Sequence, residues 1–185
     1  MAAGENVGVS EDPFFGVVRR RHPDIDIVLL PPEPPAEPTG EPSAALLDPA
    51  DLADVPALFD AELTRLWDDV ADGIARPDVR SRWTPGSSTG SVAREGLLAV
   101  EGVGGVVATQ ALVTAERALA ADGWHVLVPE TGMPRVLASR DGTDADPVRR
   151  ELQVVHAGGR YAVSYRRDGY RVGVPAARAL LEAGS

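Results

Sequence analysis

Two glycine-containing dipeptides in the last third of the chain constrain its fold more than any other feature. Gly158-Gly159 and Asp168-Gly169 separate three runs in which apolar and polar residues alternate, over residues 151–157, 161–167 and 170–174. A two-residue connection that ends in glycine is typical of a type I′ β-hairpin. The spacing therefore predicts three antiparallel strands joined by two tight turns.

The predicted turns also determine which residues face each other. In the first hairpin we expect Glu151 opposite Arg166, and in the second we expect Arg166 opposite Arg171. Two facing arginines repel unless an anion lies between them. Either Glu151 supplies that charge in a structural row, or the arginines form a shallow site for an anion or an acidic peptide. The predicted core side carries Leu152, Val154, Tyr161, Val163, Tyr165, Val172 and Val174.

Apolar periodicity places helices before and after this sheet. Helical spacing predicts a helix over 55–75, with Asp54 as its N-cap, and a second over 106–121. Residues 78–91 read as a loop, and 96–101 as a strand or a helical turn. Further strands are expected over 124–128 and 135–140, and a short helix over 176–182. The pattern predicts an α+β fold: an antiparallel five-stranded meander packed by two helices.

A proline-rich segment divides the chain. Residues 31–42 contain six prolines, which favour a semi-rigid polyproline II linker. We therefore expect an acidic tail over 1–42, carrying an apolar peptide over 13–30, and an α+β domain over 43–185. The candidate docking residues of that peptide are Phe14, Phe15, Ile27 and Leu29. The peptide either adds an edge strand to its own domain or docks on a partner.

Charge and composition exclude several classes of function. The chain has 18 basic residues, all arginine, and no cysteine, so lysine Schiff bases, thiol nucleophiles and cysteine metal sites are absent. The net charge is −10. Nucleic acids and anionic membranes are therefore poor partners. The first residues lack the pattern of a secretory signal, which indicates a cytoplasmic protein.

Few residues form a pattern that predicts chemistry. Gly102-Val103-Gly104-Gly105 precedes a predicted helix, in the order strand, glycine loop, helix, strand of a nucleotide-binding unit, but Val107 replaces the third glycine. A glycine hinge is the alternative. His125 reads as an exposed histidine, and His156 as a partner of Tyr161 in a hydrogen bond. The acid clusters at 68–72 and 141–146 lack a complete calcium-binding pattern, so we expect no metal site. We also expect no cofactor and no set of catalytic residues.

One short stretch resembles a known family. Thr84-Pro85-Gly86-Ser87, followed by residues 93–101, is similar to a Thr-Pro-Gly-Ser-then-helix junction in chaperones of actinobacterial type VII secretion systems. The resemblance covers fewer than twenty residues, and the duplicated arrangement of those longer chaperones is not visible here. It implies a protein that holds or recognises another protein.

The sequence thus predicts a non-enzymatic protein-binding module, of a secretion-accessory, chaperone or immunity type. Its candidate partner-binding residues are Phe14, Phe15, Ile27, Leu29, Arg166 and Arg171. Two alternatives stay open: a small nucleotide-binding protein or enzyme that uses the glycine loop over 102–105, and a structural subunit of a homo-oligomer.

Overall fold

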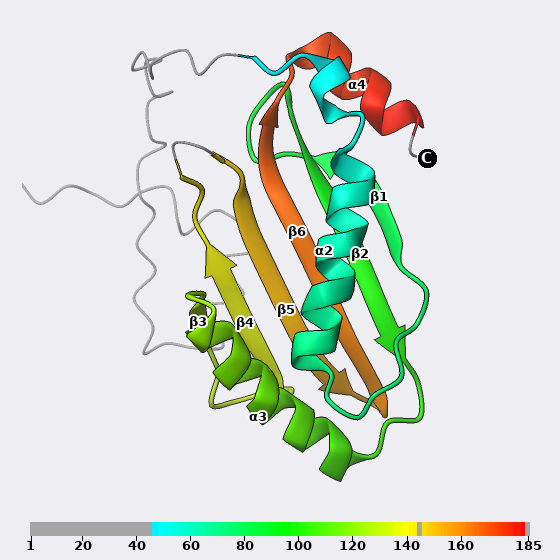
Figure 1. Ribbon diagram of the computed structural model, residues 1–185, viewed down its shortest axis with the longest axis vertical. Coiled ribbons are helices and arrows are strands. Elements are labelled where there is room, and N and C mark those ends of the chain that lie inside the picture. Colours follow the sequence, from blue (N-terminus) through cyan, green and yellow to red (C-terminus); the bar gives the residue numbers. More distant parts are fainter. Residues whose placement is uncertain (1–45, 144–145, 184–185) are drawn as a thin grey trace, which may run out of the picture. The chain divides into compact units, whose positions relative to one another are not determined.

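The computed structural model describes residues 46–143 and 146–183, which belong to the second of two units of the chain, Ala44–Ser185. Its fold is α+β, with three helices and a six-stranded antiparallel sheet. The strand order is β1-β2-β6-β5-β4-β3, so the last strand lies in the middle of the sheet. Helices α2 and α3 lie across the same side of the sheet, and α4 lies at one end of it (Figure 1). The candidate docking residues Phe14, Phe15, Ile27 and Leu29 fall outside the described residues.

The helical elements are the 3₁₀ helix η1 (Pro49–Leu52) and the helices α2 (Val55–Val70), α3 (Gly105–Ala121) and α4 (Val174–Ala183). The strands are β1 (Arg80–Pro85), β2 (Ser91–Val100), β3 (His125–Leu127), β4 (Arg135–Arg140), β5 (Arg149–Ala157) and β6 (Arg160–Arg171). No helix in the described residues is both long and apolar enough to cross a membrane.

Helix α2 begins where the sequence predicts and ends five residues earlier. The carbonyl of Val70 accepts a 2.6 Å hydrogen bond from the buried hydroxyl of Tyr161, which satisfies one of the free groups at the helix end. Ala71 leaves the helical conformation, and Gly73 has a positive φ of 73°. Asp54 occupies the N-cap position, as predicted, but its side chain makes no capping hydrogen bond.

The first predicted hairpin is confirmed. Gly158 and Gly159 have φ values of +58° and +80°, as a type I′ turn requires, and join Ala157 to Arg160. The register places Glu151 opposite Arg166, as expected. Of the predicted core residues on these two strands, Leu152, Val154, Tyr161, Val163 and Tyr165 are all buried.

The second predicted hairpin is wrong, because β6 continues through Asp168-Gly169. Asp168 does not have the positive φ that a type I′ turn needs at both positions. On β2, Ala93 pairs with Asp168 and Val92 pairs with Tyr170, so Gly169, with a φ of +110°, forms a β-bulge. Arg166 and Arg171 consequently lie five residues apart on one strand and do not face each other. Val174 is half exposed at the start of α4, and is not a core residue.

Strand β1 lies within the segment 78–91 that was expected to be a loop, and the turn that remains joins it to β2. Strand β2 covers residues 96–100 of the stretch that the sequence left undecided. The predicted five-stranded meander is therefore a six-stranded sheet, in which β6 returns to pair with both β2 and β5.

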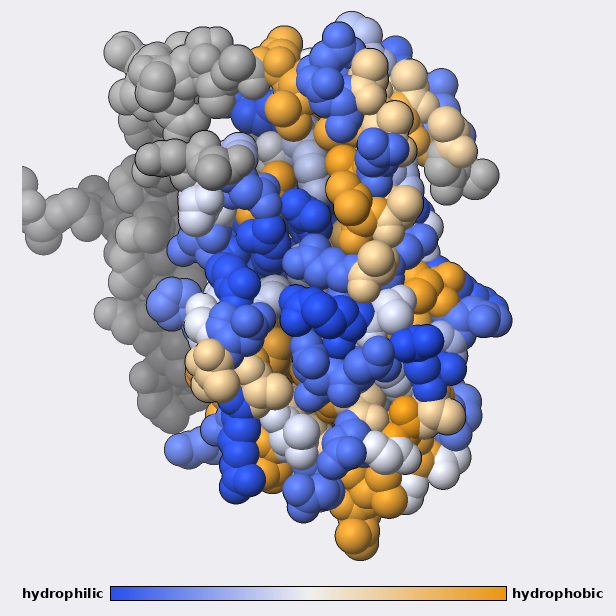
Figure 2. Space-filling model, viewed as in Figure 1, coloured by the Kyte–Doolittle hydropathy of each residue, from blue (hydrophilic) through white to orange (hydrophobic). Residues whose placement is uncertain are grey.

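The main core lies between α2, α3 and the sheet. Phe59 stacks on Tyr165 with 5.0 Å between ring centroids, and Trp67 packs edge-on against Tyr161. Alanines on the buried side of α3 allow it to pack closely. A second buried cluster lies under η1 and α4 and consists of Leu52, Trp83, Val92, Val148, Tyr170, Val172 and Ala177. One side of the sheet is thus covered by helices, whose outer surface is largely hydrophilic along α2 (Figure 2).

The closest contact between helix and sheet occurs at Gly96, and Gly96→Ala tests it. A Cβ atom there would lie 2.6 Å from Leu63 Cδ2 and 2.7 Å from Phe59 Cε1, both at fully buried side chains. We expect a loss of about 1–3 kcal/mol of unfolding free energy, measured by urea denaturation.

The matched control is Gly105→Ala at the start of α3, where a Cβ would meet no atom within 4 Å. It should leave stability unchanged or raise it slightly, because alanine favours a helix. Equal urea midpoints for the two variants would show that α2 does not press on β2.

Candidate protein-binding face

The side of the sheet opposite α2 and α3, which we call the open face, carries an ordered row of polar residues. Antiparallel register places these residues directly opposite one another on successive strands: Arg82, Glu95, Arg166, Glu151, Ser139 and His125. We call this set the charged row. Alternation of charge stabilises neighbouring strands.

Arg166, a predicted binding residue, is engaged within the domain. Its guanidinium donates to Thr84 Oγ1 at 3.1 Å, to the Pro85 carbonyl at 2.8 Å and to Asp168 Oδ2 at 3.1 Å. Asp168 is buried and accepts a further bond from the amide of Ser87. Arg166 therefore ties the β1–β2 connection to β6, with Glu95 as a second acidic neighbour at 3.8 Å.

The predicted row Glu151–Arg166–Arg171 does not form. Glu151 forms an ion pair with Arg149, at 2.9 Å, and makes none with Arg166 among the described contacts. The bulge places Arg171 on the same side of β6 as Arg166, because Tyr170 returns to the helix side beside Trp83. Within the described part of the chain, neither Arg171 nor Arg80 has an acidic partner within 4 Å.

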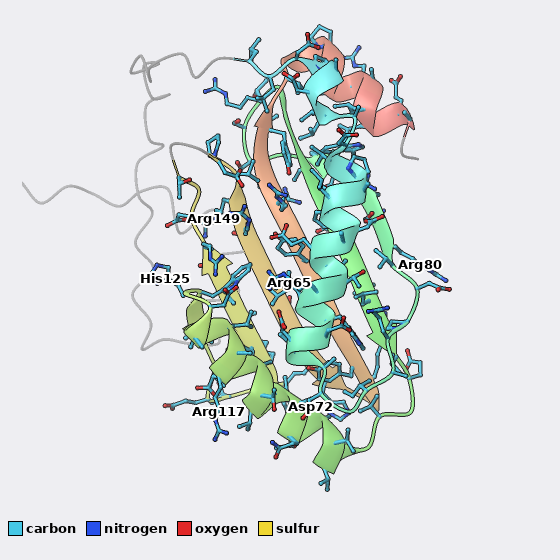
Figure 3. The ribbon with its side chains drawn as sticks, viewed as in Figure 1. Arg65, Asp72, Arg80, Arg117, His125 and Arg149 are labelled. Atoms are coloured by element: carbon cyan, nitrogen blue, oxygen red, sulfur yellow. The ribbon has the colours of Figure 1, made fainter. Side chains whose placement is uncertain are left out.

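The open face is rich in positive charge. Its strand arginines are Arg80, Arg82, Arg135, Arg149, Arg160, Arg166 and Arg171, and its strand acids are Glu95, Glu151 and Asp168. Glu101 and Asp141, on adjoining loops, pair with Arg160 and Arg149. Figure 3 shows Arg80 pointing away from β1 at the margin of the sheet. The open face therefore carries more arginines than acidic residues.

Apolar residues and a hollow adjoin this charge. Leu97, Leu137 and Leu127 lie in the next register row, with Ser164 and Gln153 between the leucines. A hollow of about 400 Å³ is lined by residues of both rows, among them His125, Leu137 and Arg166. A second hollow of about 390 Å³ continues toward β1 and shares Glu95 and Ser164 with the first. The open face thus combines arginine, apolar side chains and concavity.

The charged row does not form a catalytic triad. His125 is opposite Ser139, and Ser139 is opposite Glu151, so the serine lies between the histidine and the acid. Nucleophilic catalysis needs the histidine between the other two groups. Ser139 and Glu95 cannot be recognised as members of this row from the sequence, because only the strand order places them there.

The helix side carries four arginines in register: Arg140, Arg150, Arg167 and Arg94. Glu62 of α2 lies 3.6 Å from Arg150 and 3.4 Å from Arg167, and Asp146 forms ion pairs with the same two arginines. Burial acts to lower the pKa of Arg150, but Asp146 and Glu62 outweigh it, so this pKa is raised. This layer is therefore a structural ion-pair network.

Arg94 is less well compensated than its neighbours. It is 9% exposed, lies over the ring of Trp83 at 5.4 Å, and donates to Ser81 Oγ at 2.8 Å, while Ser81 donates to Asp60. Burial lowers its pKa, and Asp60 and Tyr170 offset only part of that effect. The arginine is thus stabilised mainly by an aromatic ring and a hydroxyl.

The glycine loop anchors the start of α3, and its surroundings lack the strand order of a dinucleotide fold. Val103 donates from its amide to the Gly159 carbonyl at 2.8 Å, and its own carbonyl lies 3.1 Å from His156 Nε2. The expected bond between His156 and Tyr161 is absent, because Tyr161 donates to Val70. Strands β2 and β3 are separated by β6, β5 and β4, so the strand–helix–strand unit of a dinucleotide fold is not present.

The acid clusters are used in ion pairs. Asp68 pairs with Arg76, and Asp69 pairs with Arg65. Across residues 46–143 and 146–183, no group of histidine and acidic residues has the geometry to hold a metal ion. The stretch after Thr84-Pro85-Gly86-Ser87 is strand β2, where the resembling chaperones have a helix. Comparison with protein-family models, curated proteins and solved structures gave no match to this chain.

Glu62→Gln tests the partly buried ion-pair layer. The amide keeps the shape of the side chain but leaves Arg150 and Arg167 with Asp146 as their one remaining anion, so we expect a loss of about 2 kcal/mol in urea denaturation. The control is Asp69→Asn in the same helix, whose pair with Arg65 is exposed and should contribute less than about 1 kcal/mol. If both variants lose the same stability, Glu62 does not hold the layer together.

The three tyrosines provide a test in alkaline solution. Burial raises the pKa of Tyr161, Tyr165 and Tyr170, the last to about 12. Their protonated forms stabilise the fold fully below the unfolded tyrosine pKa of about 10, and this contribution falls as the pH rises toward 12. At pH 10.5 the tyrosinate absorbance at 295 nm should be small in the folded protein and large in urea. Similar absorbance in both conditions would contradict the burial of these side chains.

Proposed function

We propose that the protein is a non-enzymatic binding module that receives an acidic polypeptide of another protein on its open face. The observation that carries this proposal is the excess of arginine beside the apolar row and its hollows. Arginine is enriched in protein interfaces because its planar guanidinium binds carboxylates in two-point contacts and stacks on apolar surfaces. A secretion accessory, a chaperone and an immunity protein would each need such a face. The first two roles follow the resemblance of residues 84–87 to type VII secretion chaperones, although strand β2 stands here where those chaperones have a helix.

The binding residues divide into two groups. Arg166 positions the β1–β2 connection through Thr84, Pro85 and Asp168, and presents its remaining surface to the hollow. Arg80 and Arg171, which have no acidic partner in the described part of the chain, are free to pair with carboxylates of the partner. These two arginines therefore contribute to affinity, while Arg166 contributes to both stability and binding.

The test is Arg80→Ala combined with Arg171→Ala. A partner that co-purifies with the full chain is identified by mass spectrometry, produced separately, and titrated by calorimetry at two salt concentrations. We expect the double variant to bind roughly 10-fold more weakly and to show a smaller salt dependence, because two exposed charge pairs are lost. Its urea midpoint should be unchanged.

The control variant is Arg65→Ala with Arg117→Ala, which removes two exposed arginines from the outer surfaces of α2 and α3 (Figure 3). It should bind the partner with full affinity. Equal affinities of both double variants would contradict an open-face site. Saturable nucleotide binding in the same calorimeter would favour the alternative function of the glycine loop.

A further inference from the structure

The two edges of the sheet differ in how they are protected. Strand β1 carries the exposed side chains of Arg80 and Arg82, ends in Pro85, and contacts α2 and α4. Charged residues and proline on an edge strand discourage another strand from pairing with it. The β1 edge therefore has the features of a closed edge.

The β3 edge lacks these features. Strand β3 pairs with β4 on one side and ends the sheet in the described part of the chain. Residues 124–129 contain no arginine, aspartate or glutamate. Leu127, Val128 and Met133 are 61%, 44% and 46% exposed. An uncharged edge with exposed apolar side chains is a template for an added strand.

The open-face hollow begins at this same edge. His125 and Leu127 both line the hollow of about 400 Å³ and point to the open face. Figure 3 shows His125 at the margin of the sheet. A strand added beside β3 would lie about 4.8 Å away, with every second side chain on the open face. Such a strand would reach the hollow without any change in the fold.

We propose that the acidic partner binds as an extended segment that pairs with β3 and becomes a seventh strand of the sheet. This inference rests on the proposed function and specifies how the partner is held. On the open face, the segment carries an apolar residue beside Leu127 and an acidic residue two positions away beside His125. The acidic residue faces the arginine-rich side of the sheet, so its charge complements that of the open face.

A second copy of this chain is a poorer occupant of the edge. Strand β3 has three residues, about 10 Å of strand, so two copies joined there bury far less than the roughly 1,000 Å² of a stable interface. A segment of another protein avoids this limit, because residues that follow the added strand can cross the open face toward Arg149 and Arg166.

The experiment uses the full chain and a fluorescently labelled peptide with the repeated sequence Thr-Asp-Thr-Val, which places aspartate and valine on one side of a strand. Affinity is measured by fluorescence anisotropy. Two N-methylated versions block alternate backbone amides. We expect one version to bind at least 10-fold more weakly and the other to change by less than threefold, because only alternate amides of an added strand face β3. No saturable binding, or equal responses to the two methylation patterns, would overturn the proposal.

The variant Leu127→Lys provides a second test of strand addition at β3. A lysine at the edge should weaken peptide binding at least 10-fold, whereas Val106→Lys, at an 86% exposed position on α3, should have no effect. Backbone amides of β3 that point away from β4 should exchange rapidly in the free chain and slow down with peptide. Slow exchange in the free chain at low and high concentration would show that the chain itself occupies the edge, and slowing at high concentration only would show a second copy. Either result overturns the proposal.

The two proposals fail in different ways. If the partner's affinity falls in the Arg80 and Arg171 double variant but is unaffected by Leu127→Lys, the open face binds the partner and the edge inference is wrong. If neither set of variants changes the affinity, the proposed function itself is wrong.

Discussion

The packing of α2 across β2 and β6 determines most of this structure. Phe59 and Leu63 rest directly on Gly96, and Phe59 stacks on Tyr165, so helix and sheet approach as closely as the backbone permits. This contact needs a glycine on the helix side of β2 and large side chains on α2. With α3 beside it, α2 covers one side of the sheet. In the described residues the other side has no helix over it, and this is the open face on which the proposed function rests.

A polar layer lies within the same interface. Four arginines from four strands are in register on the helix side, and Glu62 and Asp146 lie between two of them. Removing one member of such a network costs more than the network contributes to stability, because the remaining charges are left without partners. We therefore infer that these ion pairs fix the position of α2 along the sheet. Arg150 and Arg167 in this layer are paired with acidic residues of the same domain. Arg80 and Arg171, which have no such partner in the described part of the chain, lie on the open face.

Much of the fold could be predicted from local pattern. The α2 periodicity gave the correct start of the helix, and Gly158-Gly159 gave the correct turn, because each depends on a few adjacent residues. Asp168-Gly169 was predicted to be a hairpin turn and is a β-bulge. Both structures favour glycine with positive φ, and only the pairing with β2 distinguishes them. Strand β1 was expected to be a loop. Its exposed residues are arginines that alternate with Ser81 and Trp83, so the segment contains too few apolar residues to be recognised as a strand. The charged row was invisible for a related reason, since it unites six strands whose order the sequence does not state.

The distribution of charge narrows the class of partner that the proposed function requires. The chain as a whole carries a net charge of −10, yet seven arginines and three acids project from the strands of the open face. A nucleic acid extends well beyond the Debye length of about 8 Å, so most of its phosphates would lie out of reach of the open-face arginines and would gain nothing from them. A protein segment with a few carboxylates between apolar residues feels mainly the local arginines and the leucines beside them. If the proposed function holds, the contrast between the global and the local charge favours a moderately acidic, partly apolar polypeptide as the partner over a nucleic acid or an anionic membrane.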